Sequence, residues 1–169
     1  MLHWYGFFIG IAVVVGWSVA EKIEPRVNKV APWVLGFGFV GARMWHVVDT
    51  WSYYSHNLLD IVSVWNGGMS IWGGLVGGLL AWWIVDRRSW ETLGAIVSGL
   101  PLAQAIGRVG NGVNGEFVNK VWILPWWGAE AILDLMLFVL LRGVSPKYRV
   151  GVYLVGYALI RLVLQPYRL

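Results

Sequence analysis

Arginines inside or at the edge of apolar segments are the side chains of this sequence best suited to chemistry. An ionisable group is costly in lipid and usually serves a function there, and a guanidinium fork binds phosphate oxygens in pairs. A structural alternative stays open for each: an ion pair for Arg43, and extension of the charged end to lipid headgroups for the others. The four residues are Arg43, Arg108, Arg161 and Arg168.

The densest polar stretch spans residues 107–116, with the sequence GRVGNGVNGE. Glycine permits tight turns, and Arg108 and Asn111 share a helical face if the preceding apolar helix continues. Guanidinium and amide donors in such a place could cradle an anion, and their bonds to it strengthen where water is scarce. A polar turn without a catalytic role explains the glycines equally well, so both interpretations stand.

Carboxylates and histidines offer further candidates. Glu130 and Asp134 are one helical turn apart, so both face the same side of a helix. They could do acid/base work, but pairing with the intramembrane arginines is favoured because an unpaired buried charge is costly. His46 follows Arg43 by three residues on the same helical face, which makes it the best-placed histidine.

Composition limits the class of protein to which the chain can belong. Of 169 residues, 58% are hydrophobic and 13% are charged, which is too apolar for a soluble domain with a charged surface. There is no cysteine, so any reacting thiol must come from a partner. The net charge of +4 comes from Lys and Arg spread over short loops, so anionic membrane lipids, not nucleic acid, are the expected partners.

The elements that must position these residues are transmembrane helices. The sequence predicts an all-α, polytopic membrane helix bundle of about six spans at about 20 residues each, forming a single domain over residues 1–169. No Lys or Arg precedes Lys22, as a cleaved signal peptide would require, so the apolar stretch 7–16 is expected to begin an uncleaved first span. The other expected spans are Pro32–Val48, Met69–Val85, Thr92–Ile106, Pro125–Leu141 and Val150–Leu164.

Loop charges predict the orientation of the bundle. The first, third and fifth loops contain Lys or Arg, whereas loop 49–63 has neither. The positive-inside rule then puts the odd loops in the cytoplasm, and both termini, loop 49–63 and loop 107–124 on the outer side. Within residues 66–78, glycines at small-xxx-small spacing, such as Gly73 with Gly77, predict close helix packing.

Several short motifs, in their order and spacing, resemble the prolipoprotein diacylglyceryl transferase family over nearly the whole chain. Pro125 with Glu130 matches a weaker motif of that family. The main motifs are HWYG at 3–6, GAR at 41–43, WNGGMS at 65–70 followed by a glycine pair, GRVGN at 107–111, NGE at 114–116 and GYALIR at 156–161.

The resemblance implies an enzyme of lipoprotein biosynthesis in the bacterial cytoplasmic (inner) membrane. Its reaction transfers a diacylglyceryl group from phosphatidylglycerol to the lipobox cysteine of a preprolipoprotein signal peptide, towards the outer leaflet and without cofactor or metal. The residues on functional positions of the family, expected to be catalytic, are Tyr5, Arg108, Asn111 and Arg161. The expected substrate-binding residues are Arg43, Asn114, Glu116, Trp72, Arg168 and His46.

The chain also departs from the family pattern. Trp72 occupies the position of a usual histidine, and indole has no basic nitrogen. The outer segment between Glu116 and Pro125 is shorter than usual, and the chain is expected to lack the family's final span because it ends at Leu169. Further substitutions are Gly112 for Phe, Asn119 for Gly and Gln165 for Glu.

Two questions therefore stay open at the level of sequence. One is function: an active transferase leads, and a non-catalytic lipid or lipoprotein-precursor binder on the same fold is the alternative. A small transporter would need paired broken helices, and no such symmetry is evident. The other question is the base that takes the thiol proton: His46 or Glu116 could serve, or an arginine-rich field could favour the thiolate so that water or the lipid phosphate suffices.

Overall fold

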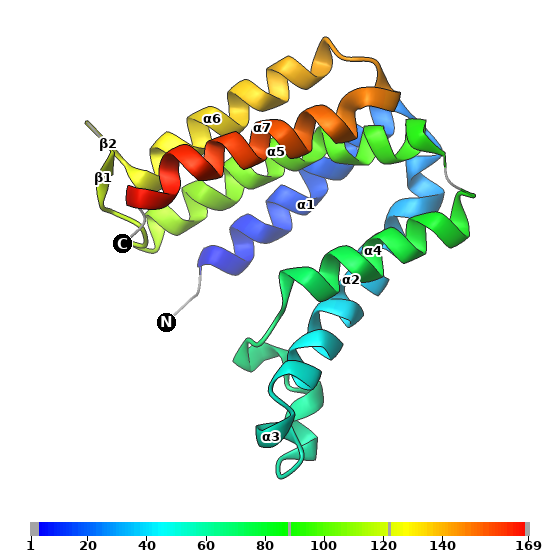
Figure 1. Ribbon diagram of the computed structural model, residues 1–169, viewed down its shortest axis with the longest axis vertical. Coiled ribbons are helices and arrows are strands. Elements are labelled where there is room, and N and C mark those ends of the chain that lie inside the picture. Colours follow the sequence, from blue (N-terminus) through cyan, green and yellow to red (C-terminus); the bar gives the residue numbers. More distant parts are fainter. Residues whose placement is uncertain (1–3, 88, 122, 168–169) are drawn as a thin grey trace. The chain divides into compact units, whose positions relative to one another are not determined.

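The computed structural model describes residues 4–87, 89–121 and 123–167, and α-helices dominate them (Figure 1). Three short 3-10 helices are η1 (Leu58–Val62), η2 (Val64–Asn66) and η3 (Gln165–Tyr167). Two short strands, β1 (Lys120–Val121) and β2 (Leu124–Pro125), pair antiparallel. The α-helices are α1 (Trp4–Ile23), α2 (Val27–Asp49), α3 (Trp51–Tyr54), α4 (Ile71–Val85), α5 (Trp90–Val113), α6 (Trp126–Arg142) and α7 (Pro146–Leu164).

The predicted fold class, an all-α membrane helix bundle, is confirmed. Each of the six expected spans coincides with one long helix. Among the described residues, three helical segments are long and apolar enough to cross a membrane: Gly6–Ile23, Trp90–Val113 and Pro146–Tyr167. Helix α4 is apolar but shorter. The number of spans and their orientation remain predictions.

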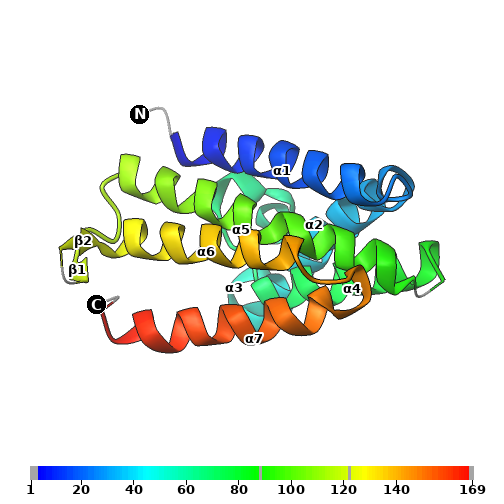
Figure 2. The same ribbon diagram turned by 90° about the horizontal axis from the view of Figure 1, so that it is seen from above.

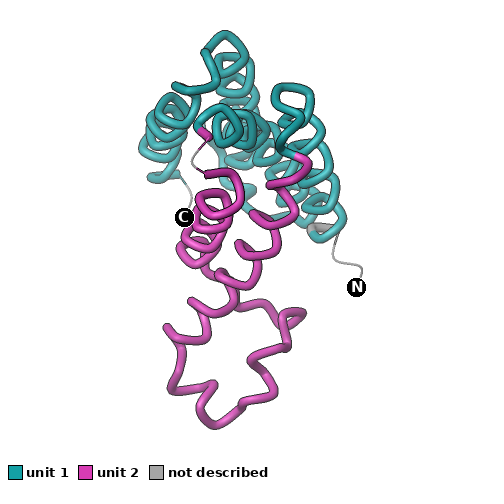
Figure 3. Tube along the Cα trace, turned by 90° about the vertical axis from the view of Figure 1, so that its right-hand side faces the viewer, with its two compact units in different colours: residues 1–27, 90–169 teal, residues 28–89 magenta. Residues whose placement is uncertain are grey.

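Backbone contacts group the chain into two compact units, which are described separately (Figure 3). Unit 1 comprises the described residues of 1–27 and 90–169, and unit 2 comprises those of 28–89. A single domain over residues 1–169 therefore stays a prediction.

Helix α5 is the central element of unit 1. It packs against α1, α6 and α7, and the four helices run side by side in Figure 2. Glycines allow the closest approach, because a Cβ on Gly99 of α5 would collide with the carbonyl of Gly16 in α1. Between α6 and α7 lies an apolar cluster that includes Trp126, Leu141 and Leu164, all buried. Helix α5 is therefore the helix that the other three share, and α6 and α7 supply most of the apolar cluster.

Unit 2 is a pair of helices, α2 and α4, joined by a long loop that contains α3, η1 and η2. The pair meets glycine to glycine: a Cβ on Gly73 would collide with the carbonyl of Gly41, and one on Gly77 with the carbonyl of Phe37. The close packing that the glycine spacing predicts is confirmed. A larger residue at either glycine would force the backbones of α2 and α4 apart.

Substitution of two glycines on the same helix tests this packing. Gly41→Ala should destabilise the protein by about 1–3 kcal/mol, because the new methyl group meets the Gly73 carbonyl, which is backbone and cannot rotate away. Gly36→Ala is the matched control: outside the adjoining backbone of its own helix, a Cβ there would meet no described atom within 4 Å. It should be neutral or stabilising by up to about 1 kcal/mol through helix propensity. Thermal unfolding in detergent measures both, and equal stability of the two variants would contradict the close α2–α4 contact.

Candidate functional site

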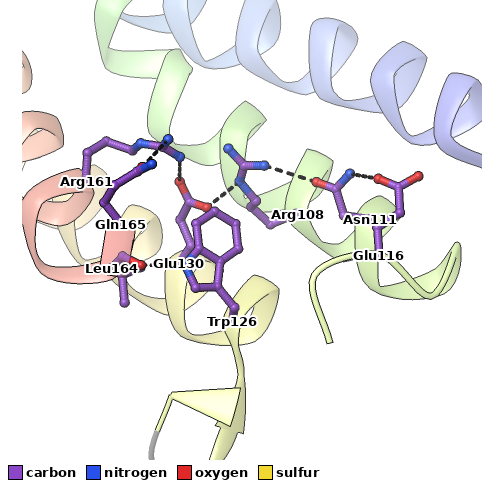
Figure 4. Close-up of polar contacts among 8 residues, drawn as sticks. All are labelled: Arg108, Asn111, Glu116, Trp126, Glu130, Arg161, Leu164 and Gln165. Carbon is purple, nitrogen blue, oxygen red and sulfur yellow. Dashed lines mark hydrogen bonds and ion pairs between the residues drawn. The ribbon is translucent and has the colours of Figure 1, made fainter. Parts of the chain in front are cut away.

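Glu130 of α6 lies at the centre of a charged cluster in unit 1 (Figure 4). Its side chain is fully buried, and its two oxygens contact arginines from two other helices. The distance from Glu130 Oε2 to Arg108 Nε in α5 is 2.7 Å, and that from Oε1 to Arg161 Nη1 in α7 is 3.5 Å. The predicted pairing of this carboxylate with intramembrane arginines is confirmed. One buried anion thus joins α5, α6 and α7.

The position of Arg108 follows from the length of α5. The helix continues to Val113, seven residues beyond the expected end of the span, so the polar motif 107–111 is helical. Arg108 and Asn111 therefore face the same side, and Arg108 Nη1 donates a hydrogen bond to Asn111 Oδ1 at 3.2 Å. Asn111 Nδ2 in turn donates to Glu116 Oε2 at 2.7 Å. Motif residues 108, 111 and 116 thus form one chain of contacts.

The turn after α5 brings Glu116 back to that chain. Gly115 has φ +72°, a left-handed conformation that glycine adopts without the penalty of a side chain. The reversal allows the Glu116 backbone N–H to donate to the Asn111 carbonyl at 2.9 Å. Asn114 approaches the same carboxylate, with Nδ2 3.5 Å from Glu116 Oε1. The glycines of the motif thus have a structural reason, and they also present three of its polar side chains together.

Trp126 contributes to the site, and sequence reasoning missed it. Its ring is fully buried and lies 5.2 Å from the guanidinium carbon of Arg108 and 5.8 Å from that of Arg161. Cation–π attraction draws both charges to the same aromatic ring. The indole Nε1 donates to the Leu164 carbonyl at 2.8 Å, which fixes the ring against α7. The available signal was spacing, because Trp126 precedes Glu130 by one helical turn.

The electrostatics of the cluster suit an anion. Two guanidinium groups share one buried carboxylate, and Arg161 Nη2 also donates to the neutral Gln165 side chain at 2.8 Å. The arginine side chains keep 20% (Arg108) and 25% (Arg161) of their surface exposed, so an added anion can reach them. Partly desolvated guanidinium groups bind phosphate or carboxylate oxygens more strongly than they would in water.

Two of the expected site residues fall outside what the structure describes. Tyr5 lies in the first turn of α1, but its side chain is outside the described part of the structure. Arg168 lies outside the described residues altogether. Their roles therefore rest on the resemblance alone.

Arg43 forms a different kind of site in unit 2. Its side chain is buried, and within the described part of the chain its five hydrogen bonds all go to backbone carbonyls of the α2–α4 loop. Positive φ angles at Gly67 and Gly68 turn two of those carbonyls towards the guanidinium. The structural role of Arg43 is therefore to hold the loop by hydrogen bonds, not by the ion pair considered from the sequence. The five acceptors belong to Asp60, Ile61, Ser63, Gly67 and Gly68.

His46 lies beside Arg43 in a polar cavity of about 280 Å³ within unit 2. The Tyr54 ring contacts Arg43 there, at 5.3 Å from the guanidinium carbon. The Tyr53 hydroxyl donates to the Asp60 carboxylate, and this hydrogen bond raises the pKa of Tyr53 above its ordinary value. Trp72, at the start of α4, is 65% exposed and is not part of the cavity wall.

Comparison with known proteins identifies the family. The family model of prolipoprotein diacylglyceryl transferase matches residues 1–169. The chain belongs to the prolipoprotein diacylglyceryl transferase family. The motif that carries Arg108 and Asn111 and the one that carries Arg161, on which the resemblance depends, are thus part of a match that covers the chain.

Similar proteins carry one name, phosphatidylglycerol–prolipoprotein diacylglyceryl transferase. That of Frankia casuarinae is 41% identical over an alignment of 129 residues, which covers 72% of this chain and 32% of the relative. That of Clostridioides difficile is 35% identical over an alignment of 136 residues, which covers 74% of this chain and 55% of the relative. That of Finegoldia magna is 27% identical over an alignment of 196 positions, which covers 99% of this chain and 79% of the relative. The chain thus spans from about a third to just over half of the length of the first two relatives.

Removal of the central carboxylate tests its structural role. Glu130→Gln should destabilise the protein by about 3 kcal/mol, because it leaves two partly buried guanidinium groups without their shared anion. Glu116→Gln is the matched control: it makes the same change in an exposed side chain and should cost less than about 1 kcal/mol. Thermal unfolding in detergent is the measurement. A loss at Glu130 no greater than that at Glu116 would refute the central role of Glu130.

Proposed function

We propose that the protein transfers a diacylglyceryl group from phosphatidylglycerol to the cysteine thiol of a preprolipoprotein. The observation that carries the proposal is the pair of partly exposed arginines, Arg108 and Arg161, held on one buried carboxylate. Membership of the prolipoprotein diacylglyceryl transferase family, and the shared name of the relatives, support the choice of donor and acceptor.

The reaction needs positive charge at one place. The thiolate sulfur attacks the glyceryl carbon that bears the phosphate, a carbon–sulfur bond forms, and the carbon–oxygen bond breaks. The electron pair of that bond leaves with the phosphate oxygen as glycerol-1-phosphate. Arg108 and Arg161 stabilise this oxygen as its charge grows, because fixed donors in a partly dry site are already oriented for the transition state. Asn111 holds Arg108 from the side through its Oδ1.

The thiol must lose its proton before the sulfur attacks. An ordinary cysteine thiol has a pKa of about 8.5, and nearby positive charge lowers it. We assign the activation to the field of the two arginines, with water or the lipid phosphate as the proton acceptor. Glu116 is the alternative base in unit 1, although its Oε2 already accepts a hydrogen bond from Asn111. His46 is the alternative in unit 2.

The site is assigned to the outer side of the bacterial cytoplasmic membrane. The proposal rests on the loop charges, which favour both termini and loop 107–124 on that side. Phosphatidylglycerol would then reach the arginines from the outer leaflet, and the lipobox segment of a signal peptide would enter laterally from the bilayer.

A non-catalytic binder of lipid or lipoprotein precursor is the second candidate function. The observation in its favour is Trp72, which stands where the family usually has a histidine.

Cysteine labelling tests the orientation. The chain has no cysteine, so a single introduced thiol reports one position without background. In intact cells, a membrane-impermeant maleimide should label Val118→Cys, in an exposed position of the outer loop, and should not label Ser89→Cys until the membrane is permeabilised. Labelling of Ser89→Cys from outside would show that the predicted orientation is wrong.

A transfer assay tests the activity. Purified protein in phosphatidylglycerol vesicles should increase the mass of a lipobox peptide by one diacylglyceryl group. Arg108→Ala should reduce the rate about 100-fold or more, and Arg108→Lys should reduce it less, because lysine keeps the charge but loses the bidentate fork. Arg26→Ala, which changes an exposed arginine paired with Glu24, is the control and should keep full activity. Full activity of Arg108→Ala would show that Arg108 is not part of the catalytic site.

The same assay separates the two candidate functions through Trp72→His. In an active enzyme, this variant should keep or raise the rate, and His46→Ala should cost little. If the unmodified protein is inert and Trp72→His alone restores transfer, the chain is a binder descended from a transferase.

A further inference from the structure

Asp134 is a buried acid one helical turn beyond Glu130 on α6, and no described residue is its partner. Its side chain is fully buried, as is that of Glu130. Yet neither of its carboxylate oxygens has a hydrogen-bond partner or an ion pair among the described residues, whereas Glu130 contacts two arginines. The mechanism above does not use Asp134, so its burial needs another explanation.

A second polar layer of unit 1 surrounds Asp134. Helices α5 and α6 run in opposite directions (Figure 2) and Arg108 contacts Glu130. Gln104, one turn before Arg108, is therefore at the level of Asp134, one turn after Glu130. The Gln104 Oε1 atom is likewise buried without a partner. Tyr153 of α7 hydrogen bonds with the Gln104 side chain and interacts electrostatically with Asp134.

The chemistry of this layer favours a neutral acid. An ionised carboxylate only accepts hydrogen bonds, and so does Gln104 Oε1, so the two groups cannot satisfy each other. An isolated carboxylate in an apolar interior is destabilised strongly, whereas the protonated acid avoids most of that cost. A proton on Asp134 supplies the one donor that the two unpartnered groups lack.

The charge of the neighbouring arginine site depends on this proton. The charged and titratable groups that face Asp134 are Glu130 on its own helix, Arg108 on α5, and Arg161 and Tyr153 on α7. Two guanidinium groups and the Glu130 carboxylate sum to one positive charge. A second ionised carboxylate would cancel that charge and repel an incoming phosphate, whereas a neutral Asp134 preserves it.

We propose that Asp134 carries a proton in the resting protein and keeps it while a phosphodiester headgroup binds at Arg108 and Arg161. Asp134 is then a positioning residue for charge: it does not touch the lipid, but its protonation state sets the affinity of the arginine site for an anion. Loss of the proton at high pH adds a negative charge beside the arginines and weakens binding. The lipid part of this inference rests on the proposed function, whereas the protonation of Asp134 does not.

Infrared spectroscopy tests the proton without any lipid ligand. The protein in detergent at neutral pH should have the carbonyl stretching band of a buried carboxylic acid, and Asp134→Asn should lack it. Asp49→Asn, which makes the same change at an exposed position, should keep the band. Absence of the band from the unmodified protein, or its persistence in Asp134→Asn, would overturn the proposal.

Lipid binding at several pH values tests the consequence. Retention of phosphatidylglycerol relative to phosphatidylcholine, measured by native mass spectrometry, should fall about tenfold or more in the unmodified protein as the infrared band disappears. Asp134→Asn should bind as the unmodified protein does at low pH and should not weaken as pH rises. The same pH dependence in both proteins would overturn the inference.

The two measurements distinguish the possible failures. A band that behaves as expected, without phosphatidylglycerol binding at any pH, supports the charge state of Asp134 and contradicts the proposed function. If Asp134→Asn does not fold, the unmodified protein alone decides, because its band and its lipid retention must be lost over the same pH range. Loss of one without the other contradicts the coupling.

Discussion

The buried carboxylate of Glu130 is the interaction on which the rest of unit 1 depends. It is the shared partner of guanidinium groups from α5 and α7, and it projects from α6, so the three helices meet at one ionic contact. Neither arginine could stay near an apolar interior without it, since an isolated charge there is strongly disfavoured. The same contact reduces two positive charges to one without removing either arginine from the surface. Stability and the proposed anion binding therefore depend on one group, and its loss would affect both.

The helices can meet there because α5 carries little bulk where its neighbours approach. Gly99 lies against the Gly16 backbone of α1, Gly110 against the Phe8 side chain of the same helix, and Gly112 against the Trp127 ring of α6. A side chain at Gly112 would press on the Trp127 ring and force α5 and α6 apart, which would move Arg108 away from Glu130. Gly110 and Gly112 of the 107–116 stretch thus serve helix packing, whereas Gly115, with its positive φ, serves the turn.

Much of this arrangement could be predicted from the sequence, and the misses have physical causes. The long helices follow from apolar runs of near-membrane length, and the pairing of Glu130 follows from the cost of an isolated charge. The expected end of α5 at Ile106 was wrong because hydropathy falls at the polar motif, although the helix continues to Val113. Trp126 was missed because tryptophan is abundant in this chain and its packing against two arginines depends on tertiary structure. The same cost argument included Asp134 among the arginine partners, but the register of α5 on α6 puts Gln104 at its level instead.

The contrast between Arg43 and the arginine pair explains why the anion site is assigned to unit 1. A guanidinium has five N–H donors, and the five hydrogen bonds of Arg43 go to loop carbonyls, so a ligand would have to displace backbone contacts that hold the loop. Arg108 and Arg161 instead share a carboxylate and keep part of their surface exposed. The loop carbonyls use the N–H donors of Arg43 in hydrogen bonds. One carboxylate shared by Arg108 and Arg161 instead leaves one net positive charge at the pair. An arginine of the first kind organises backbone, and a pair of the second kind remains able to bind an added anion.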